Sequence, residues 1–392
     1  MAGSAAQKLL LLRMRLPRDI SSHSDGPERI LEEQVMDRLR VAVVGVGALG
    51  RHHARILSTM PGVELVAVAD PNPTQGQAVA DACRCEWTPD FRTLAGQVDA
   101  ASIVVPTFLH QKVAEEFLQR GVPVLIEKPL AKTAAEARAL VRLANEKKIP
   151  LQVGHIERFN PAFVELANSV GSPRYIRTER HSPYPFRSTD IGAVHDLLIH
   201  DIELVLHLAA SPVAGIEAFG LCLVGGHEDC VQARLRFENG CIADLSASRL
   251  CPQTKRSIQA WSAEGWATAD LQARSVTRIK PGVPVLAGQL PFDLSLQKGA
   301  NIAQLKEEMF TKFFPMETVS VTEGDALTLE LSSFLDCVRT GRRPVVNGED
   351  ALKAVEVAEG ILQSMEAHAW NGTAAGPMGI QALFSPAAKA AA

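Results

Sequence analysis

The sequence predicts an α/β fold in two parts, a doubly wound parallel sheet followed by an α+β domain with an open, mostly antiparallel sheet. From residue 40 to about 156, short apolar runs alternate with helical stretches, as in a parallel sheet covered by helices. A glycine-rich turn joins the first apolar run to the first helical stretch. Beyond Asn160 the apolar runs lengthen and tight turns such as Glu238-Asn239-Gly240 separate them, which favours antiparallel strands.

The first part has five predicted strands and four predicted helices. The strands are residues 41–44, 65–69, 101–105, 124–126 and 151–153. The helices are residues 50–60, 75–82, 110–120 and 134–147. Strands and helices follow one another in strict alternation, so a crossover helix is expected between neighbouring parallel strands.

The second part has six predicted strands and three predicted helices. The strands are residues 175–181, 213–224, 230–237, 243–249, 257–262 and 266–271, and the helices are residues 193–208, 325–340 and 349–366. The predicted domains are an N-terminal extension at 1–37, a doubly wound α/β domain at 38–156, an α+β domain at 157–370, and a flexible tail at 371–392. Weak periodicity in the extension, and the alanine and glycine content of the tail, set the outer two boundaries.

The turn after the first strand has the pattern G-x-G-x-x-G, with glycines at Gly45, Gly47 and Gly50. The first allows a sharp turn, the second a close approach to a pyrophosphate, and the third tight packing of helix on strand. Asp70 ends the second strand, where its carboxylate would accept hydrogen bonds from both adenosine ribose hydroxyls. We expect Gly45, Gly47, Ala48, Leu49, Gly50 and Asp70 to bind the cofactor. Pro71-Asn72-Pro73 supplies no cation for a 2'-phosphate, so the pattern favours NAD over NADP.

Composition excludes several classes of partner. The 392 residues carry 40 Lys and Arg against 44 Asp and Glu, a formal charge of −4, which argues against nucleic acid or an anionic membrane. The longest early apolar block, residues 9–12, is too short for a signal peptide or a membrane span, so we expect a cytoplasmic protein. The seven cysteines show no paired C-x-x-C motifs and are expected to be free or buried thiols.

Polar residues follow the third and fourth predicted strands, at the edge where ligands of open α/β sheets bind. We expect Thr107, His110, Glu127 and Lys128 to lie against the cofactor. A partly desolvated Lys128 beside a positively charged nicotinamide would have a lowered pKa and could help take a substrate proton. The alternatives are that His110 only begins the next helix and that Lys128 is a surface lysine before a turn proline.

Asp196 and His200 are four residues apart on a predicted helix and therefore share one face. Histidine titrates near neutral pH and is suited to proton transfer, while the carboxylate could orient the imidazole or bind a hydroxyl. Taken alone, the pair is also compatible with an ordinary helix surface. The sequence offers no obvious third ligand, so no metal site is predicted.

Together, the turn at 45–50, the Glu127-Lys128-Pro129 motif and the stretch from Asp196 to His200 resemble the family of glucose-fructose oxidoreductase, inositol dehydrogenase and MocA. The resemblance covers about residues 40–365. It implies a Rossmann domain followed by an α/β domain whose open sheet often mediates dimers or tetramers. It also implies that Lys128, Asp196 and His200 line the active site and are catalytic, and that the Lys128-Pro129 bond is cis.

Two further segments, residues 153–161 and 190–208, resemble the subgroup of UDP-N-acetylglucosamine 3-dehydrogenases, which serve diamino-sugar synthesis for lipid A. Arg158 and Asn160 are then expected to face the cleft, where Arg158 would bind a diphosphate. Tyr184 and Arg187 are weaker candidates for sugar or uracil contacts. With Lys128, Asp196 and His200, these residues form the predicted substrate site.

The resulting expectation is NAD-dependent oxidation of the C3 hydroxyl of UDP-N-acetylglucosamine by a homodimer or homotetramer. Because the oxidation is uphill, a following step should consume the ketone, and the resemblance implies an aminotransferase as that metabolic partner. Two alternatives stay open at this point. One is a dehydrogenase of a free sugar or polyol such as myo-inositol, and the other is an NAD-binding regulator without catalysis.

Overall fold

The computed structural model of the chain describes residues 38–186, 191–224, 226–321, 324–370 and 373–374. The predicted extension at 1–37, Arg187 and nearly all of the predicted tail lie outside the described residues. Two large sheets organise the rest, and both predicted sheet types are confirmed. None of the described helices is both long and apolar enough to cross a membrane.

The first sheet has six parallel strands in the order β3-β2-β1-β4-β5-β6. The strands are β1 (Leu39–Val44), β2 (Val63–Ala69), β3 (Glu86–Thr88), β4 (Ala100–Ile103), β5 (Val124–Glu127) and β6 (Leu151–Gly154). The order reverses between β1 and β4, so the loops after these strands diverge and leave a ligand crevice at this switch point. Only the three-residue edge strand β3 was not predicted.

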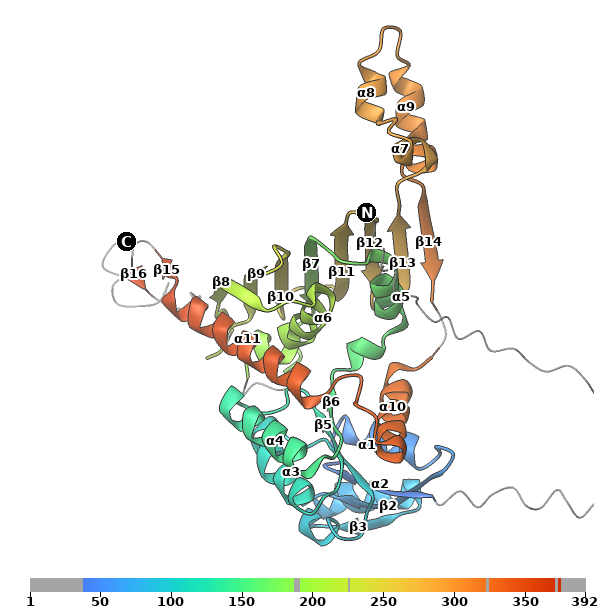
Figure 1. The fold of residues 1–392 in the computed structure, drawn as a ribbon. Helices are drawn as coiled ribbons and strands as arrows, with labels where there is room; N and C mark the ends of the chain where they lie inside the picture. Colours follow the sequence, from blue (N-terminus) through green and yellow to red (C-terminus); the bar gives the residue numbers. More distant parts are fainter. Residues whose placement is uncertain (1–37, 187–190, 225, 322–323, 371–372, 375–392) are drawn as a thin grey trace, which may run out of the picture. The chain divides into compact units, whose positions relative to one another are not determined.

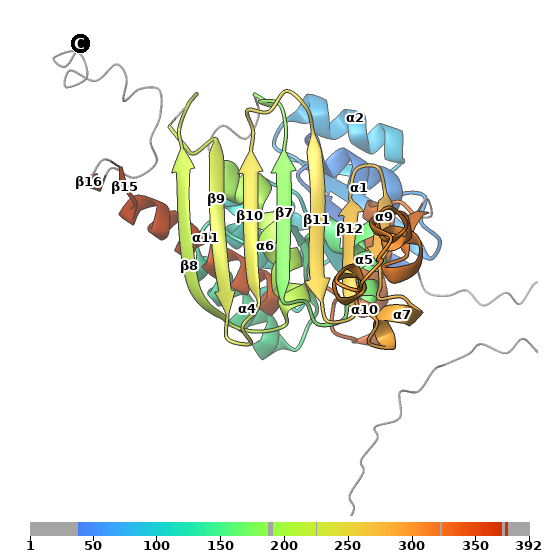
Figure 2. The same ribbon diagram turned by 90° about the horizontal axis from the view of Figure 1, so that it is seen from above.

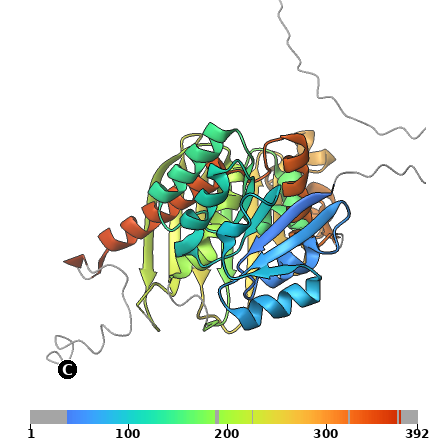
Figure 3. The ribbon, with the colours of Figure 1, turned by 90° about the horizontal axis from the view of Figure 1, so that it is seen from below.

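Helices cover both faces of this sheet, as Figure 3 shows around the blue and cyan strands. Their ranges are α1 (Gly50–Leu57), α2 (Pro73–Cys83), α3 (His110–Gln119), α4 (Ala134–Lys147), α10 (Ala326–Thr340) and α11 (Gly348–Ala367). One apolar core joins the sheet to α1, α2 and α10, with Leu331, Phe334 and Leu335 of α10 buried. The other joins it to α3, α4 and the start of α11. The first sheet therefore takes core residues from the far end of the chain.

The second sheet has eight strands in the order β14-β13-β12-β11-β7-β10-β9-β8. They are β7 (Tyr175–His181), β8 (Val213–Leu221), β9 (Cys230–Phe237), β10 (Ile242–Ser248), β11 (Lys255–Ser262), β12 (Gly265–Asp270), β13 (Ser275–Ile279) and β14 (Met316–Ser320). Only β7 and β10 pair in parallel. All other neighbours are antiparallel, as predicted.

The described helices that share a core with the second sheet lie on one of its faces. α5 (Pro161–Val170), α6 (Ile199–Ala209) and α11 form a buried core with the strands. Figure 2 shows the opposite face, on which no described helix lies over β8, β9, β10, β7 or β11. The sequence did not predict α5, whose start is set by the Asn160 cap and by Pro161 at the first helical position.

Residues between β13 and β14 form a separate arm of short helices. They are α7 (Val283–Leu286), α8 (Pro291–Ser295) and α9 (Ile302–Glu308), followed by a π-helical turn at Met309–Phe313. Figure 1 shows this arm extending beyond the sheet edge, away from the other helices. A short ribbon of β15 (Ala369–Trp370) and β16 (Thr373–Ala374) follows α11.

Candidate active site

The glycine turn after β1 has the geometry that close phosphate binding requires. Gly45 has a φ of +85°, and a Cβ there would lie 2.6 Å from the Val104 carbonyl oxygen. A Cβ at Gly50 would overlap the Gly45 carbonyl, whereas Gly47 has open space around it. No side chain caps the first turn of α1, and no acidic residue lies in it. The positive end of the helix dipole is therefore available to a pyrophosphate.

Asp70 directly follows β2, beside this turn, and is buried, with 7 % of its surface exposed. Its Oδ2 accepts hydrogen bonds from the backbone N–H of Val46 at 3.0 Å and from Nε2 of Gln75 at 3.0 Å. Its Oδ1 accepts the backbone N–H of Asn72 at 2.9 Å. The carboxylate thus holds both neighbouring loops in place, and Oδ1 keeps acceptor capacity for a ribose hydroxyl. These residues fit an adenine dinucleotide without a 2'-phosphate.

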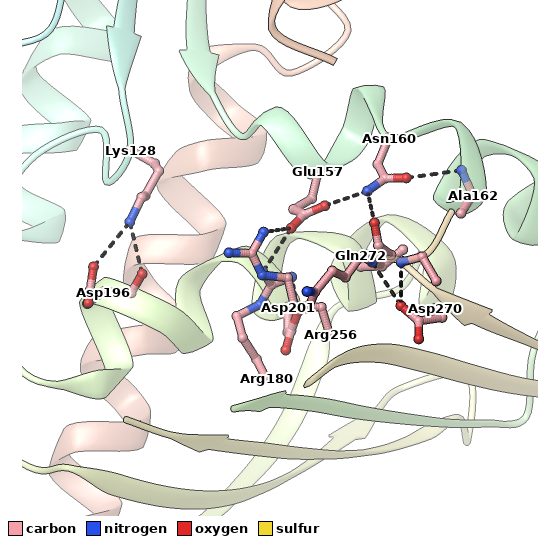
Figure 4. Close-up of polar contacts among 12 residues, drawn as sticks. Lys128, Glu157, Asn160, Ala162, Arg180, Asp196, Asp201, Arg256, Asp270 and Gln272 are labelled. Atoms are coloured by element: carbon pink, nitrogen blue, oxygen red, sulfur yellow. Dashed lines mark hydrogen bonds and ion pairs between the residues drawn. The ribbon is translucent and has the colours of Figure 1, made fainter. Parts of the chain in front are cut away.

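Lys128 meets the second domain directly, as Figure 4 shows. Its Nζ donates to the backbone carbonyl of Asp196 at 2.9 Å and lies 3.7 Å from Oδ1 of the same residue. Both side chains are 15 % exposed. The Lys128–Pro129 peptide is cis, as the family resemblance implied. An amine from the first sheet and a carboxylate from the second domain therefore lie together.

His200 lies on the same helix as Asp196, and the two domains contribute to its surroundings. Residues Val194–Leu198 form a π-helical turn that leads into α6, a distortion often found at functional sites. Burial, together with the positive charges of Lys128 and Arg180, holds the pKa of His200 well below its usual range. The imidazole is therefore neutral at neutral pH, and its unprotonated nitrogen can accept a hydrogen bond.

His155 was not predicted as a site residue, yet it follows β6 and lies beside His200. The two rings meet edge to face with centroids 6.4 Å apart. Both ring nitrogens of His155 and Nδ1 of His200 are buried and make no hydrogen bond within the described residues. Burial and the charge of Lys128 lower the pKa of His155 to about 3. The signal in the sequence was its position directly after a strand end.

Glu127 holds the turn that carries Lys128, because its carboxylate accepts the backbone N–H of Lys128 at 3.2 Å. Its carboxylate lies 3.2 Å from Nε2 of the buried His53, whose Nδ1 is 2.9 Å from Oγ of Ser102. Burial would raise the pKa of Glu127, but the hydrogen bond and charge of His53, with Lys128, hold it below the usual value. Glu127 is thus an ionised anchor for the turn that carries Lys128.

His110 and Thr107 follow β4. His110 begins α3 and is 1 % exposed, with Nδ1 2.8 Å from the Pro129 carbonyl and Nε2 2.9 Å from the Val105 carbonyl. Its ring is committed to the backbone on either side, which ties the lysine turn to the loop after β4. Thr107 is partly exposed and opens a short 3₁₀ turn at Thr107–Leu109.

Arg158 pairs with an acidic side chain of α6. It forms a 2.6 Å ion pair with Glu203, and the two side chains are 9 % and 2 % exposed. The pair lines a cavity of about 730 Å³ that also includes His207, Pro212 and Lys353. Burial raises the pKa of Glu203 to about 7 in spite of the arginine. The predicted diphosphate contact therefore has an acidic partner inside the protein.

Asn160 is also engaged within the protein, as Figure 4 shows. Its Oδ1 caps α5 by accepting the N–H of Ala162, and its Nδ2 donates to Glu157 at 2.9 Å and to the Leu271 carbonyl at 3.0 Å. Glu157 accepts in turn from Arg180 at 2.8 Å. This buried cluster fixes the segment after β6, and sequence reasoning did not identify Arg180 as its centre.

Tyr184 lies in the loop after β7. Its ring packs against Phe186 and against the guanidinium of Arg249, 5.1 Å from the ring centroid. Arg249 also donates to the Ile191 carbonyl at 2.9 Å, directly before the helix that bears Asp196. Tyr184 is therefore linked to the entrance of that helix.

No group of three or more His, Cys, Asp or Glu residues that could hold a metal ion occurs among the residues placed by the structure. All seven cysteines are free.

Comparisons with known proteins agree with this geometry. Residues 39–155 match the NAD-binding Rossmann-fold domain of the GFO_IDH_MocA oxidoreductase family, and residues 166–268 match a C-terminal domain of the same family. The chain is 32 % identical over 333 residues to UDP-N-acetylglucosamine 3-dehydrogenase of Acidithiobacillus ferrooxidans, covering 85 % of this chain and 99 % of the relative. A solved structure of that enzyme superposes with a TM-score of 0.73 at 30 % identity, covering 83 % and 97 % of the two chains.

A second relative, the scyllo-inositol 2-dehydrogenase (NAD(+)) of Bacillus subtilis, is 28 % identical over 340 residues, covering 82 % of this chain and 92 % of its own. Levoglucosan dehydrogenase, solved with NADH and levoglucosan, shares the fold with a TM-score of 0.69 at 18 % identity. The family match, the glycine turn and Asp70 together identify NAD as the cofactor. The chain belongs to the Gfo/Idh/MocA family and is an NAD-dependent oxidoreductase.

Proposed function

We propose that this protein oxidises the C3 hydroxyl of UDP-N-acetylglucosamine to a 3-keto sugar nucleotide, for the synthesis of diamino-sugar lipid A. The observation that carries the proposal is the meeting of Lys128 with Asp196 across the two domains, one helical turn from a neutral His200. The 32 % identity to a UDP-N-acetylglucosamine 3-dehydrogenase supports this choice of substrate.

The residues of the chain divide the proton chemistry among them. His200 is neutral and accepts the hydroxyl proton, and Lys128 hydrogen-bonds the same oxygen. Asp196 holds Lys128 in position. NAD, when bound, supplies the ring that takes up the hydride from the carbon. The alcohol thus loses one hydride and one proton.

The substrate is tested with purified protein, NAD and a panel of UDP-sugars, read at the absorbance of NADH with a carbonyl trap to remove the ketone. UDP-N-acetylglucosamine should give the fastest turnover, and mass spectrometry of the trapped product should locate the ketone at C3. Lys128→Met should abolish turnover, whereas Lys132→Met, which alters an exposed lysine nearby, should not. NADH formation that needs no nucleotide would contradict the proposal.

A second candidate is oxidation of a free sugar or polyol. It is favoured by the ion pair between Arg158 and Glu203, because the arginine expected to bind a diphosphate is already paired within the protein. Relatives include an inositol 2-dehydrogenase of Rhizobium meliloti at 25 % identity. Turnover of myo-inositol without any effect of UDP on thermal stability would favour this candidate.

The proposed reaction also implies partners. Oxidation of a secondary alcohol by NAD is uphill at neutral pH, so an aminotransferase that converts the ketone to an amine would draw the reaction forward. We further propose that the chain acts as a homodimer or homotetramer, since one face of its eight-stranded sheet has no covering helix within the described residues.

A further inference from the structure

The arm between β13 and β14 carries a concentration of exposed apolar side chains. Seven large hydrophobic residues between positions 283 and 310 are 44 to 81 % exposed. They are Val283, Leu286, Leu290, Phe292, Leu296, Ile302 and Phe310. Solvent-exposed apolar residues scattered singly are ordinary, but seven of them on one short segment favour an interaction surface there.

The described part of the chain gives the helices of the arm few packing contacts. Helices α7, α8 and α9 span four, five and seven residues, and none of their residues is buried. Isolated helices of this length are unstable in water, because nucleation costs more than a few hydrogen bonds return. Figure 1 shows the arm pointing away from the body of its own chain. A partner molecule would supply the stabilising contacts that the described part of its own chain does not.

The chemistry of the arm selects a protein surface as that partner. Between residues 280 and 315 the cations are Lys280, Lys298, Lys306 and Lys312, and the anions are Asp293, Glu307 and Glu308. A nearly neutral segment without arginine or tryptophan has no electrostatic attraction to nucleic acid or to an anionic membrane. Apolar burial is the contribution that it can make.

We propose that the arm packs against a second copy of this chain and holds the oligomer together. The seven side chains together expose roughly 800 Å², the area that one partner contributes to a stable protein interface. A second copy also brings a sheet face on which no described helix lies over β8, β9, β10, β7 or β11, and Ile242 of β10 is exposed. This inference does not depend on which sugar is the substrate.

The register of the sheet gives a precise way to remove the arm. Ile279 of β13 pairs with Met316 of β14, so residues 280–315 can be replaced by Asn-Gly, which closes two antiparallel strands with a tight turn. Light scattering should show the wild-type chain as an oligomer. The molar mass of the shortened protein in solution should be half that of the wild-type oligomer or less. Thermal stabilisation by NAD should persist in the shortened chain, because the glycine turn and Asp70 lie on the other sheet.

Point variants separate the apolar surface from the mere presence of the arm. The triple variant Leu286→Gln, Phe292→Gln and Leu296→Gln should weaken self-association at least tenfold. The matched triple variant Gln289→Ala, Gln297→Ala and Lys298→Ala alters exposed polar residues of the same arm and should associate like wild type. A monomeric wild-type chain, or a shortened chain of unchanged mass, would overturn the proposal.

Discussion

Replacing Asp70 by asparagine tests the cofactor site most directly. The carboxylate accepts three hydrogen bonds within the protein, from Val46, Asn72 and Gln75, at 2.9 to 3.0 Å. Asparagine keeps one oxygen but places an NH₂ group where the other oxygen accepted a backbone N–H. Two donors then face each other, and the ribose loses its charged acceptor.

The magnitude follows from these contacts. A hydrogen bond to a charged group contributes about 1.5–3 kcal/mol, so the Kd for NAD should rise by roughly 10- to 150-fold. Binding of NADP should weaken far less, because the substitution also removes the negative charge that opposes a 2'-phosphate. The preference for NAD over NADP should therefore fall at least about tenfold.

The assay is isothermal titration of both cofactors against each variant. Gln75→Ala is the matched control, because it removes one donor to Asp70 while the carboxylate stays in place. Its cofactor preference should equal that of wild type. An unchanged preference in Asp70→Asn, with NAD binding intact, would refute the ribose role of Asp70.

Three further predictions concern the catalytic and buried residues. Lys128→Met should lower kcat by roughly 10²- to 10⁴-fold in steady-state assays and leave the Kd for NAD within a few-fold of wild type; a normal kcat would exclude proton chemistry at Lys128. Arg158→Met should lower the free energy of unfolding, measured in urea, by about 3 kcal/mol, because it leaves Glu203 buried without its partner. Adding Glu203→Met should restore most of that stability. A raised KM for the nucleotide sugar at unchanged stability would instead assign Arg158 to the diphosphate. His155 has a pKa of about 3 in the folded chain, so between pH 6.5 and pH 4 only the unfolded chain binds a proton at this residue. The free energy of unfolding of the wild type, measured in urea, should therefore fall by about 1.4 kcal/mol per pH unit relative to that of His155→Phe. Parallel pH profiles for the two proteins would show that His155 is not held neutral.

Much of the first sheet could be predicted because parallel strands buried on both faces are continuous apolar runs. Val41 to Val44 and Val124 to Ile126 have this pattern and are strands in the structure. The edge strand β3 (Glu86–Thr88) lacks it, since it has three residues and none is buried. The arm helices were missed for the same reason, because a helix without a buried face leaves no apolar periodicity.

The candidate site was predictable where a residue directly follows a strand or shares a helix face. Lys128 follows β5, and Asp196 and His200 are four residues apart, so the place of each followed from topology or spacing. That Lys128 and Asp196 meet across the two domains was implied by the family resemblance alone. Arg158 is different. It lies in the 3₁₀ helix Ile156–Phe159, and its partner Glu203 is 45 residues away. No sequence pattern near Arg158 predicts the direction of that turn or the pairing with Glu203.

The burial of α10 against the first sheet sets an order for biosynthesis. Leu331, Phe334 and Leu335 complete a core whose other members lie between Val41 and Leu125. During translation, α1 and α2 can cover their part of this face early, but the part that α10 covers stays exposed until the ribosome has made about two hundred more residues. A fragment that ends after β6 would keep that apolar part open to water. The nascent chain therefore exposes apolar surface, which favours aggregation, until α10 has left the ribosome.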